Sequence, residues 1–344
     1  MKLRTFRCFE ALRVELGPTN FFIGRNGEGK TSILEAACVL LRLQSQRSST
    51  LAPLIRIGQQ RFTIGGRYAQ HELEFRYSTL RRKLIFDAVE QSTTSEYLRL
   101  ARVVSFANTD IELVRGASDA RRRFLDFLGA QVDPLYRPTL RAYERALRAR
   151  NALLKSPQPR PREIAAYVPP LLEHGAKLSA MRAEVVRQLA PFAAAAHDAI
   201  SGVKEQLTVE FTPGNEPDFA AHLAQSAAQE ARLRQTVVGP HRDDLTLLIN
   251  EKAAAQFASE GQQRTAVLAL KTAQARVLSR DAAPPLLLVD DIFGELDPER
   301  RNRLLRSLPA DAQKLVTATT KSWIEEASDA RQFTVSQGNV TLAQ

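Results

Sequence analysis

A phosphate-loop motif near the N-terminus constrains the fold of this chain more than any other feature. Residues 24–31 match the pattern G-x-x-x-x-G-K-[ST] at every fixed position. A strand-like segment at 20–23 precedes the motif, and a helical pattern at 31–43 follows it. A strand, a glycine-rich turn and a helix in this order form the structure in which the motif binds phosphate. The sequence therefore predicts an α/β fold, with a mixed sheet flanked by helices around a nucleotide site.

The fixed residues of the motif predict a site for ATP and Mg²⁺. Glycines let the backbone approach phosphate oxygens, and the N-terminus of the following helix adds a favourable potential. We expect Lys30 to reach the β- and γ-phosphates and the Thr31 hydroxyl to ligate Mg²⁺. The predicted ATP-binding residues of this segment are Gly24, Arg25, Asn26, Gly27, Glu28, Gly29, Lys30, Thr31 and Ser32.

The acidic partner of the phosphate loop lies in the last fifth of the chain. Two prolines precede the aliphatic run 286–289, which predicts a fully buried parallel strand. At its C-terminal end, Asp290 would hold Mg²⁺, and Asp291 would orient or activate the attacking water. The candidate catalytic residues are Lys30, Asp290 and Asp291, and the candidate metal ligands are Thr31 and Asp290.

A third motif, S-x-G-Q at 259–262, stands about thirty residues before the acidic strand. A serine hydroxyl and a glycine N–H at a helix N-terminus form an anion-binding cap. An ordinary N-cap serine explains such a motif in isolation, but this order of motifs is typical of ATPases that close as dimers around nucleotide. We therefore expect Ser259, Gly261 and Gln262 to contact the γ-phosphate held by a second subunit.

The charge of the chain is basic and unevenly spread. The formal net charge is +10, and eleven bases against four acids between residues 137 and 187 give a local surplus of +7. Such a stretch favours a polyanion, most often nucleic acid, whereas a solvated helix face is the alternative explanation. Arg141, Arg145 and Arg148 are the candidate DNA-binding residues.

Composition excludes several other classes of protein. The hydrophobic fraction of 44% is ordinary for a globular protein, and 344 residues suffice for two domains. No apolar run reaches the roughly 18 residues of a membrane span, and the first residues lack the apolar core of a secretory signal. Cys8 and Cys38 are too few for a disulfide scaffold or a four-ligand zinc site. We expect a cytoplasmic protein without a membrane partner.

The remaining pattern predicts a helical lobe inserted into the nucleotide-binding head. Residues 111–200 are almost wholly helical in pattern, and prolines between 157 and 170 indicate a connector between longer helices. Further strand-like segments lie at 14–16, 61–90 (an antiparallel patch), 102–106, 207–211 and 244–249. We expect a split head formed by 1–108 and 205–344 and a basic helical lobe at 109–204.

Six segments together resemble the RecF family of ABC/SMC-like ATPases. They are FIGRNGEGKTSILEA at 22–36, IELVRGASDARRRFLD at 111–126, ARNALLK at 149–155, VVGPHRDDL at 237–245, SEGQQRTAVLALKTAQ at 259–274 and LLLVDDIFGELDPERR at 286–301. The resemblance covers nearly the whole chain, and GPHRDD with GQQRT is typical of this family rather than of ABC ATPases in general. It implies an ABC-type ATPase head.

The resemblance also implies a function in DNA repair and replication. It implies an ATP-dependent homodimer that binds DNA at gaps and single/double-strand junctions, with slow, DNA-stimulated hydrolysis that releases the DNA. It implies work with RecO and RecR to load RecA recombinase during fork restart and the SOS response. By motif, it places Arg7 against the nucleotide, Asp297 at the dimer interface, and Thr319 and Thr320 at the switch position.

The chain departs from the family pattern at two positions. Asn108 replaces a proline before Asp110, a candidate contact for Mg²⁺ or water, and Lys321 stands where an acidic residue is common.

We expect His241 to be a structural hydrogen-bonding residue without a chemical role, and Trp323 to be a packing residue.

Three other functions are weighed against a DNA-binding ATPase. The nucleotide-binding subunit of a membrane transporter would carry a glutamine after the central strand and a switch histidine, and this sequence has neither. An SMC-like structural ATPase would need coiled-coil arms longer than the insertion of about ninety residues. The S-x-G-Q motif argues against a metabolic phosphate-loop kinase.

Overall fold

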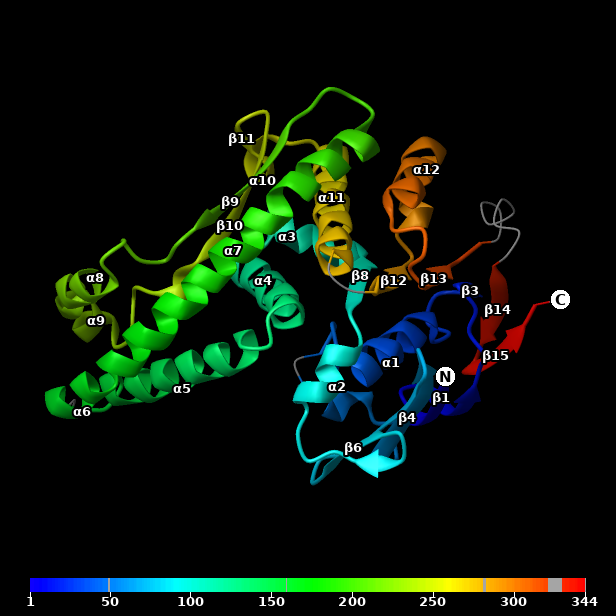
Figure 1. Cartoon of the computed structure of the whole chain (residues 1–344), viewed down its shortest axis with the longest axis horizontal. Helices are drawn as coiled ribbons and strands as arrows, with labels where there is room; N and C mark the ends of the chain where they lie inside the picture. The colour runs from blue at the N-terminus through cyan, green and yellow to red at the C-terminus, as the bar shows by residue number, and fades with distance from the viewer. Residues whose placement is uncertain (49, 159, 281–282, 321–329, 344) are drawn as a thin grey trace. The chain divides into compact units, whose positions relative to one another are not determined.

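The chain divides into two compact units, each described here by itself. The computed structural model describes residues 1–48, 50–158, 160–280, 283–320 and 330–343. The first unit comprises Met1–Asp110 and Leu278–Gln344, and the second comprises Ile111–Val277 (Figure 1). The expected split placed the second boundary at 204, whereas residues 205–277 group with the helices. The reason is that β9 (Leu207–Thr212) pairs with β10 (Asp244–Ile249) and contacts the long helix α7 (Val168–Ser201).

A six-stranded mixed sheet forms the centre of the first unit. Its order is β15-β14-β3-β13-β12-β8. Five strands are parallel, and β15 alone is antiparallel to its neighbour. The strands are β3 (Thr19–Ile23), β8 (Val103–Ala107), β12 (Leu286–Asp290), β13 (Lys314–Ala318), β14 (Arg331–Ser336) and β15 (Asn339–Leu342). The predicted strands at 20–23, 102–106 and 286–289 therefore lie in one sheet, and the parallel pairing brings their carboxyl ends to one edge.

An antiparallel sheet with the order β2-β1-β4-β5-β6-β7 forms the rest of the first unit. Its strands are β1 (Lys2–Phe6), β2 (Phe9–Arg13), β4 (Arg61–Tyr68), β5 (His71–Ser78), β6 (Arg82–Phe86) and β7 (Val89–Glu90). The antiparallel patch predicted at 61–90 is present, but the strand predicted at 14–16 is wrong because β2 ends at Arg13. The hairpin was missed because Arg7 turns the chain with a φ of 51°, where neither glycine nor asparagine marks the turn.

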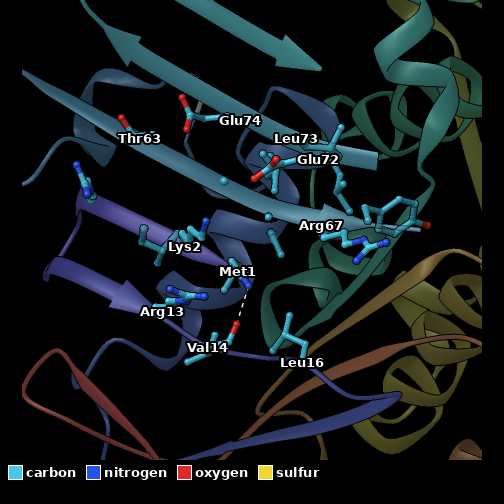
Figure 2. A pocket seen from close by; sticks show the side chains of 18 of the residues that line it. Met1, Lys2, Arg13, Val14, Leu16, Thr63, Arg67, Glu72, Leu73 and Glu74 are labelled. Carbon is cyan, nitrogen blue, oxygen red and sulfur yellow. Dashed lines mark hydrogen bonds between the residues drawn. The ribbon is translucent and has the colours of Figure 1, made fainter. Parts of the chain in front are cut away.

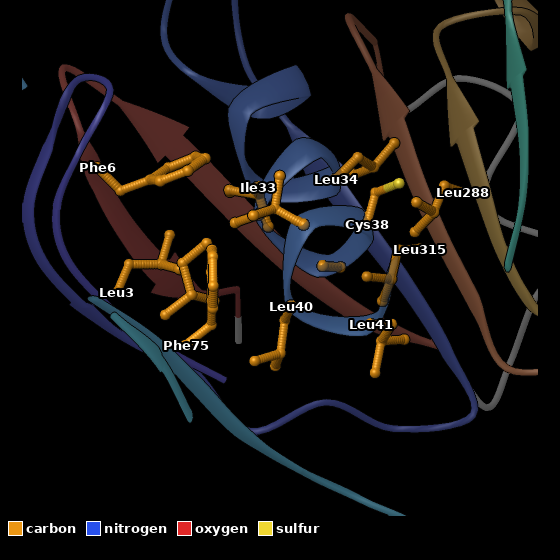
Figure 3. Packing of buried hydrophobic residues seen from close by; sticks show 14 of the residues in the cluster. Leu3, Phe6, Ile33, Leu34, Cys38, Leu40, Leu41, Phe75, Leu288 and Leu315 are labelled. Carbon is orange, nitrogen blue, oxygen red and sulfur yellow. The ribbon is translucent and has the colours of Figure 1, made fainter. Parts of the chain in front are cut away.

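One hydrophobic core joins both sheets to the helix that follows the phosphate loop. This helix, α1 (Lys30–Arg42), contributes Ile33, Leu34 and Leu40 to the core. Around it lie Leu3, Phe6 and Phe75 from the antiparallel sheet and Leu288 and Leu315 from the mixed sheet (Figure 3). Burying apolar surface on all sides holds the helix, and with it the start of the phosphate loop, in a fixed position.

Helices dominate the second unit, as the sequence pattern predicts. The longer ones are α4 (Ser118–Val132), α5 (Tyr136–Leu154), α7 and α11 (Glu260–Ser279); the short ones are α3 (Glu112–Arg115), α6 (Pro161–Ala166), α8 (Phe219–Gln225), α9 (Ala227–Leu233) and α10 (Ala254–Phe257). A small sheet, β11-β10-β9, completes the unit, with β11 at Lys252–Ala253. The predicted proline connector is short, because Pro169 and Pro170 lie in the first turn of α7, where no backbone donor is lost. None of the described helices is long and apolar enough to cross a membrane.

Candidate nucleotide-binding site

The phosphate loop connects β3 to α1 through two left-handed glycines. Gly27 has a φ of 85° and Gly29 a φ of 105°, values that other residues rarely adopt. A Cβ atom on Gly29 would also lie 2.5 Å from the sulfur of Cys8. The predicted strand, turn and helix are all present, and Gly29 is required by both its conformation and the space around it.

The Lys30 side chain lies back over its own loop. Its Nζ donates to the carbonyl oxygens of Gly24, at 2.7 Å, and Arg25, at 3.0 Å. The Glu28 carboxylate accepts a hydrogen bond of 2.9 Å from the Arg25 N–H and thereby closes the turn. An ammonium group has three donors, so one remains for a phosphate oxygen.

The hydroxyls of Thr31 and Thr317 and the Asp291 N–H meet at the C-terminal end of β12, where Asp290 lies. Asp290 Oδ1 accepts a hydrogen bond of 2.8 Å from the Thr31 hydroxyl and another of 2.8 Å from the Thr317 hydroxyl. Thr317 Oγ1 in turn accepts a hydrogen bond of 2.9 Å from the Asp291 N–H. Asp290 pairs with Thr317 in the parallel register of β12 and β13. The sequence reasoning missed Thr317, although its place near the end of the aliphatic segment before Thr319 was a usable signal.

Asp291 has an unusual backbone and a shifted acidity. Its φ is 53°, in the left-handed region, where a residue with a Cβ is held at a cost of about 1–2 kcal/mol. Burial raises its pKa most, the charges of Asp290 and Glu295 raise it further, and Lys30 opposes the shift. A carboxylate with a raised pKa is a better proton acceptor for a water molecule.

A pocket of about 660 Å³ opens over these groups. It is lined by the phosphate loop, by Asp290 and Asp291, and by Arg7, Cys8, Arg47, Pro53, Ile55, Arg56 and Ile57. The Arg7 guanidinium faces this pocket while it is held by Glu35, with bonds of 2.9 and 3.0 Å. Besides Arg7, which the family resemblance indicated, the structure therefore adds Arg47 and Arg56 as basic residues of the pocket wall.

A larger cavity of about 1540 Å³ lies away from this chemistry. It is bordered by the N-terminus and the antiparallel sheet, including Lys2, Arg13, Arg67 and Glu74 (Figure 2). None of its lining residues belongs to the phosphate loop or to the acidic strand end. We therefore place the nucleotide in the smaller pocket, where the phosphate-binding groups converge.

The donor set of the smaller pocket fits a magnesium ion completed by phosphate and water. Thr31 and Asp290 offer a hydroxyl and a carboxylate oxygen that already lie 2.8 Å apart. Among the described residues, no group of three or more His, Cys, Asp or Glu side chains is arranged to hold a metal. Mg²⁺ keeps several waters and takes one or two protein ligands beside a nucleotide, so this sparse set suits it.

The S-x-G-Q motif opens α11 in the second unit. The Gln262 N–H donates to Ser259 Oγ at 3.3 Å, and Gln262 Oε1 accepts from the Ser259 N–H at 2.7 Å. This reciprocal pair is a capping box, which satisfies two orphan donors at the helix start. Gly261 follows in the first turn.

The remaining candidate residues of the first unit lie outside the pocket lining, and the hydrogen bonds or exposure of each are as follows. Asp297 caps α12 (Pro298–Ser307) by accepting from the Arg300 N–H at 2.9 Å, and this bond lowers its pKa. Asp110 accepts from the Ala107 N–H at 2.8 Å. Thr319 and Thr320 are exposed just after β13. Asn108 donates to Glu295 at 2.6 Å, and Lys321 and Trp323 lie outside the described residues.

The arginines of the helical region differ sharply in their surroundings. Arg141, Arg145 and Arg148 are exposed on α5. Arg150, on the same helix, is 5% exposed and pairs with Glu230, while Arg182 is buried between Asp126 and Asp243, at 2.9 and 3.0 Å. Part of the predicted basic surplus is therefore neutralised inside the unit.

His241 of the GPHRDD motif is a structural residue, as the sequence predicts. Its Nε2 donates to the Thr236 carbonyl at 2.9 Å, and its Nδ1 accepts from the Tyr143 hydroxyl at 2.7 Å. Burial lowers the pKa of His241 to about 4, so the ring is neutral near pH 7.

Comparison with known proteins identifies the family. The family model described as "RecF/RecN/SMC N terminal domain" matches residues 1–341. The protein named DNA replication and repair protein RecF from Bacillus cereus (strain G9842) is 34% identical over 363 residues, 99% of this chain and 97% of the relative. Its namesake from Symbiobacterium thermophilum is 35% identical over 364 residues, with the same coverage. The chain belongs to the RecF family.

Solved structures agree with RecF-family membership over the full length. A structure described as the recombination mediator protein RecF-ATPrS in the RecFOR pathway has a TM-score of 0.88 at 25% identity and covers 100% of this chain and 97% of its own. The corresponding RecF-ATP structure has a TM-score of 0.87 at 26% identity and covers 100% and 96%. A Smc head domain from Pyrococcus furiosus reaches 0.55 at 14% identity, covers 99% and 94%, and supports the fold alone. The predicted ABC-type head fold is confirmed.

Proposed function

We propose that this RecF-family protein is an ATP-driven homodimer that binds DNA and releases it when ATP is hydrolysed. The observation that carries the proposal is the set of hydrogen bonds in which Thr31 and Thr317 both donate to Asp290 beside the Lys30 ammonium. This set joins the start of α1 to the ends of β12 and β13, which lie far along the chain, at the edge where nucleotides bind in parallel sheets. RecF structures of the same fold are described as complexes with ATP and ATPrS.

Each group at the strand edge has a distinct role in the proposed ATPase. Lys30 neutralises charge on the β- and γ-phosphates, and Thr31 with Asp290 holds Mg²⁺, which supplies electrostatic stabilisation of the transferred phosphoryl group. Asp291, at the end of β12 and lining the same pocket, orients the attacking water. Arg7, which also lines the pocket, contacts the nucleotide.

The second half of the ATP site comes from another copy of the chain in this proposal. Ser259, Gly261 and Gln262 contact the γ-phosphate of the partner, Asp297 lies at the interface, and Thr319 with Thr320 forms the switch. In this proposal the functional head combines 1–108 with 205–344, although residues 205–277 fold with the helices of the second unit. Nucleotide holds the two copies together, and hydrolysis separates them.

DNA and the partner proteins complete the proposal. The exposed arginines of α5 contact phosphates, and the preferred DNA carries a gap or a single/double-strand junction. Because similar structures are described in the RecFOR pathway, we propose that this protein works with RecO and RecR to promote RecA loading. Slow, DNA-stimulated hydrolysis resets the complex.

Sedimentation with ATP, ADP or no nucleotide, with and without gapped DNA, tests the proposal. A dimer should form with ATP only, and gapped DNA should sediment with it. The Ser259→Arg variant should bind ATP as a monomer but should not dimerise, because the long arginine side chain blocks the place where Ser259 would contact the γ-phosphate of the second copy. The Lys30→Met variant should lose ATP binding itself. Dimerisation of the Ser259→Arg variant at wild-type affinity would contradict the two-copy site.

A further inference from the structure

The side chain of Gln262, at the start of α11, is hydrogen-bonded to the carboxylate of Glu205, which belongs to none of the sequence motifs. Gln262 Nε2 donates to Glu205 Oε1 at 2.7 Å, and Glu205 belongs to the segment between α7 and β9. The two residues are separated by 57 positions in the sequence. A hydrogen bond to a charged acceptor is roughly twice as strong as a neutral one. Glu205 is therefore the strongest external contact of the Gln262 side chain.

This contact fixes which way the Gln262 amide faces. With Nε2 bound to Glu205, Oε1 is left to accept from the Ser259 N–H at 2.7 Å. The same Ser259 receives the Gln262 N–H on its hydroxyl oxygen, at 3.3 Å. Because the Ser259 oxygen is the acceptor in that bond, its own O–H can donate to an anion.

Glu205 lies beside a buried histidine without a hydrogen bond to it. Its side chain is 16% exposed and faces His197, which is fully buried, with Nε2 at 4.0 Å from Glu205 Oε2. Burial lowers the pKa of His197, so the ring is neutral near pH 7 and does not compete with Gln262 as a cation. The hydrogen bond from Gln262 to Oε1 is therefore the direct polar contact of this carboxylate that carries the argument.

We propose that Glu205 is a positioning residue of the S-x-G-Q motif, which holds Gln262 and through it the Ser259 hydroxyl ready for the γ-phosphate of a second copy. This inference rests on the proposed function, because it concerns the contact between copies. Glu205 acts through Gln262 and does not touch the nucleotide. Without it, the Gln262 amide loses the bond on Nε2, and the bond from the Ser259 N–H to Oε1 is held less firmly.

Three variants and one control test this role by sedimentation with ATP. Glu205→Ala should weaken ATP-dependent dimerisation by about tenfold or more, the effect of one charge-assisted hydrogen bond. Glu205→Gln keeps an acceptor oxygen at the same reach and should restore most of the affinity, whereas Glu205→Asp, one methylene shorter, should not. Glu210→Ala removes an exposed carboxylate from the neighbouring strand β9 and should dimerise like the wild type.

ATP binding by the monomer and the melting temperature separate positioning from folding. Both should match the wild type in Glu205→Ala, since the phosphate loop lies in the other unit. Wild-type dimerisation in Glu205→Ala, an equal defect in Glu205→Gln, or a parallel loss of monomer ATP binding and melting temperature would each overturn the assignment. A wild-type protein that stays monomeric with ATP would instead overturn the proposed function, and the positioning role with it.

Discussion

At the scale of single residues, the site depends on Thr317, which belongs to none of the motifs recognised in the sequence. Thr317 is fully buried, donates to Asp290 and accepts from the Asp291 N–H. It thereby sets the orientation of the two acidic groups that the sequence did predict. Its importance follows from the register of two parallel strands, which a single sequence does not encode locally.

Replacing Thr317 by valine should damage hydrolysis more than ATP binding. The substitution keeps the side-chain volume but removes two hydrogen bonds around Asp290 and Asp291, each worth about 1 kcal/mol or more. We expect kcat for ATP hydrolysis to fall about tenfold or more, with ATP affinity within about threefold of the wild type. Steady-state hydrolysis and equilibrium titration measure the two, and Thr341→Val, at an exposed position on β15, is the matched control. An equal loss of both quantities would contradict this prediction.

His241 makes the stability of the protein depend on pH. Its folded-state pKa of about 4 lies below the ordinary value of 6.5. Between these two pH values the unfolded chain is protonated at this residue and the folded chain is not. The contribution is complete above about pH 6.5 and is lost as the pH falls toward 4. Between pH 7 and 5 the free energy of unfolding should fall by about 2 kcal/mol from this residue.

Urea unfolding of the wild type and of His241→Gln at both pH values isolates that term. Glutamine keeps a donor and an acceptor but does not titrate in this range, so the variant should lose less stability on acidification. His197, whose pKa burial also lowers, contributes with the same sign in both proteins and cancels in the comparison. An identical pH dependence in the two proteins would refute the assignment.

At the scale of the element, α5 presents two different faces. Arg141, Arg145 and Arg148 follow a helical spacing of four and three residues and are exposed, and Arg148 forms a surface ion pair with Glu144 at 3.4 Å. Arg150, by contrast, is buried and pairs with Glu230 inside the unit. Charge counting along the sequence treats these arginines alike. Only the orientation of the helix shows which of them are available to a polyanion.

Neutralising the exposed face of α5 should lower DNA affinity and its dependence on salt. Changing Arg141, Arg145 and Arg148 together to alanine removes up to three phosphate contacts, and each contributes about 0.9 to the slope of log K against log salt. We expect the slope to decrease by about three in titrations of gapped DNA. A variant with Lys204, Arg232 and Arg234 changed to alanine, all exposed in the same unit, is the control. An unaltered slope in the α5 variant would move the DNA surface elsewhere.

At the scale of the whole molecule, each unit has a hydrophobic core of its own. The first centres on α1 and both sheets, and the second on Tyr136, Tyr143, Leu178 and Phe219. The chain enters the second unit after Asp110 and returns at Leu278. The nucleotide pocket is lined entirely by the first unit. We therefore expect bound ATP to stabilise the first unit and not the second.

Calorimetry should resolve two unfolding transitions, one for each unit. ATP with Mg²⁺ should raise the midpoint temperature of the transition that belongs to the first unit and leave the other unchanged. A ligand that binds one unit stabilises it by RT ln(1 + [L]/Kd), about 2.7 kcal/mol at one hundred times Kd. The Ser259→Arg background keeps the protein monomeric, so that dimerisation does not add to the shift. Equal shifts of both transitions, or a single transition that moves as one, would show that the units unfold together.

The sequence determined the parts of the site that are contiguous in the chain. The phosphate loop, its flanking strand and helix, the acidic strand end and the capping box each rest on residues within one or two turns of one another, so local pattern suffices. The tertiary structure alone decided the contacts between distant segments. Thr317 beneath Asp290, Glu205 against Gln262, the burial of Arg150 and Arg182, and the turn at Arg7 all depend on strand register or helix orientation. Those features are fixed by packing of the whole core, which no short stretch of sequence contains.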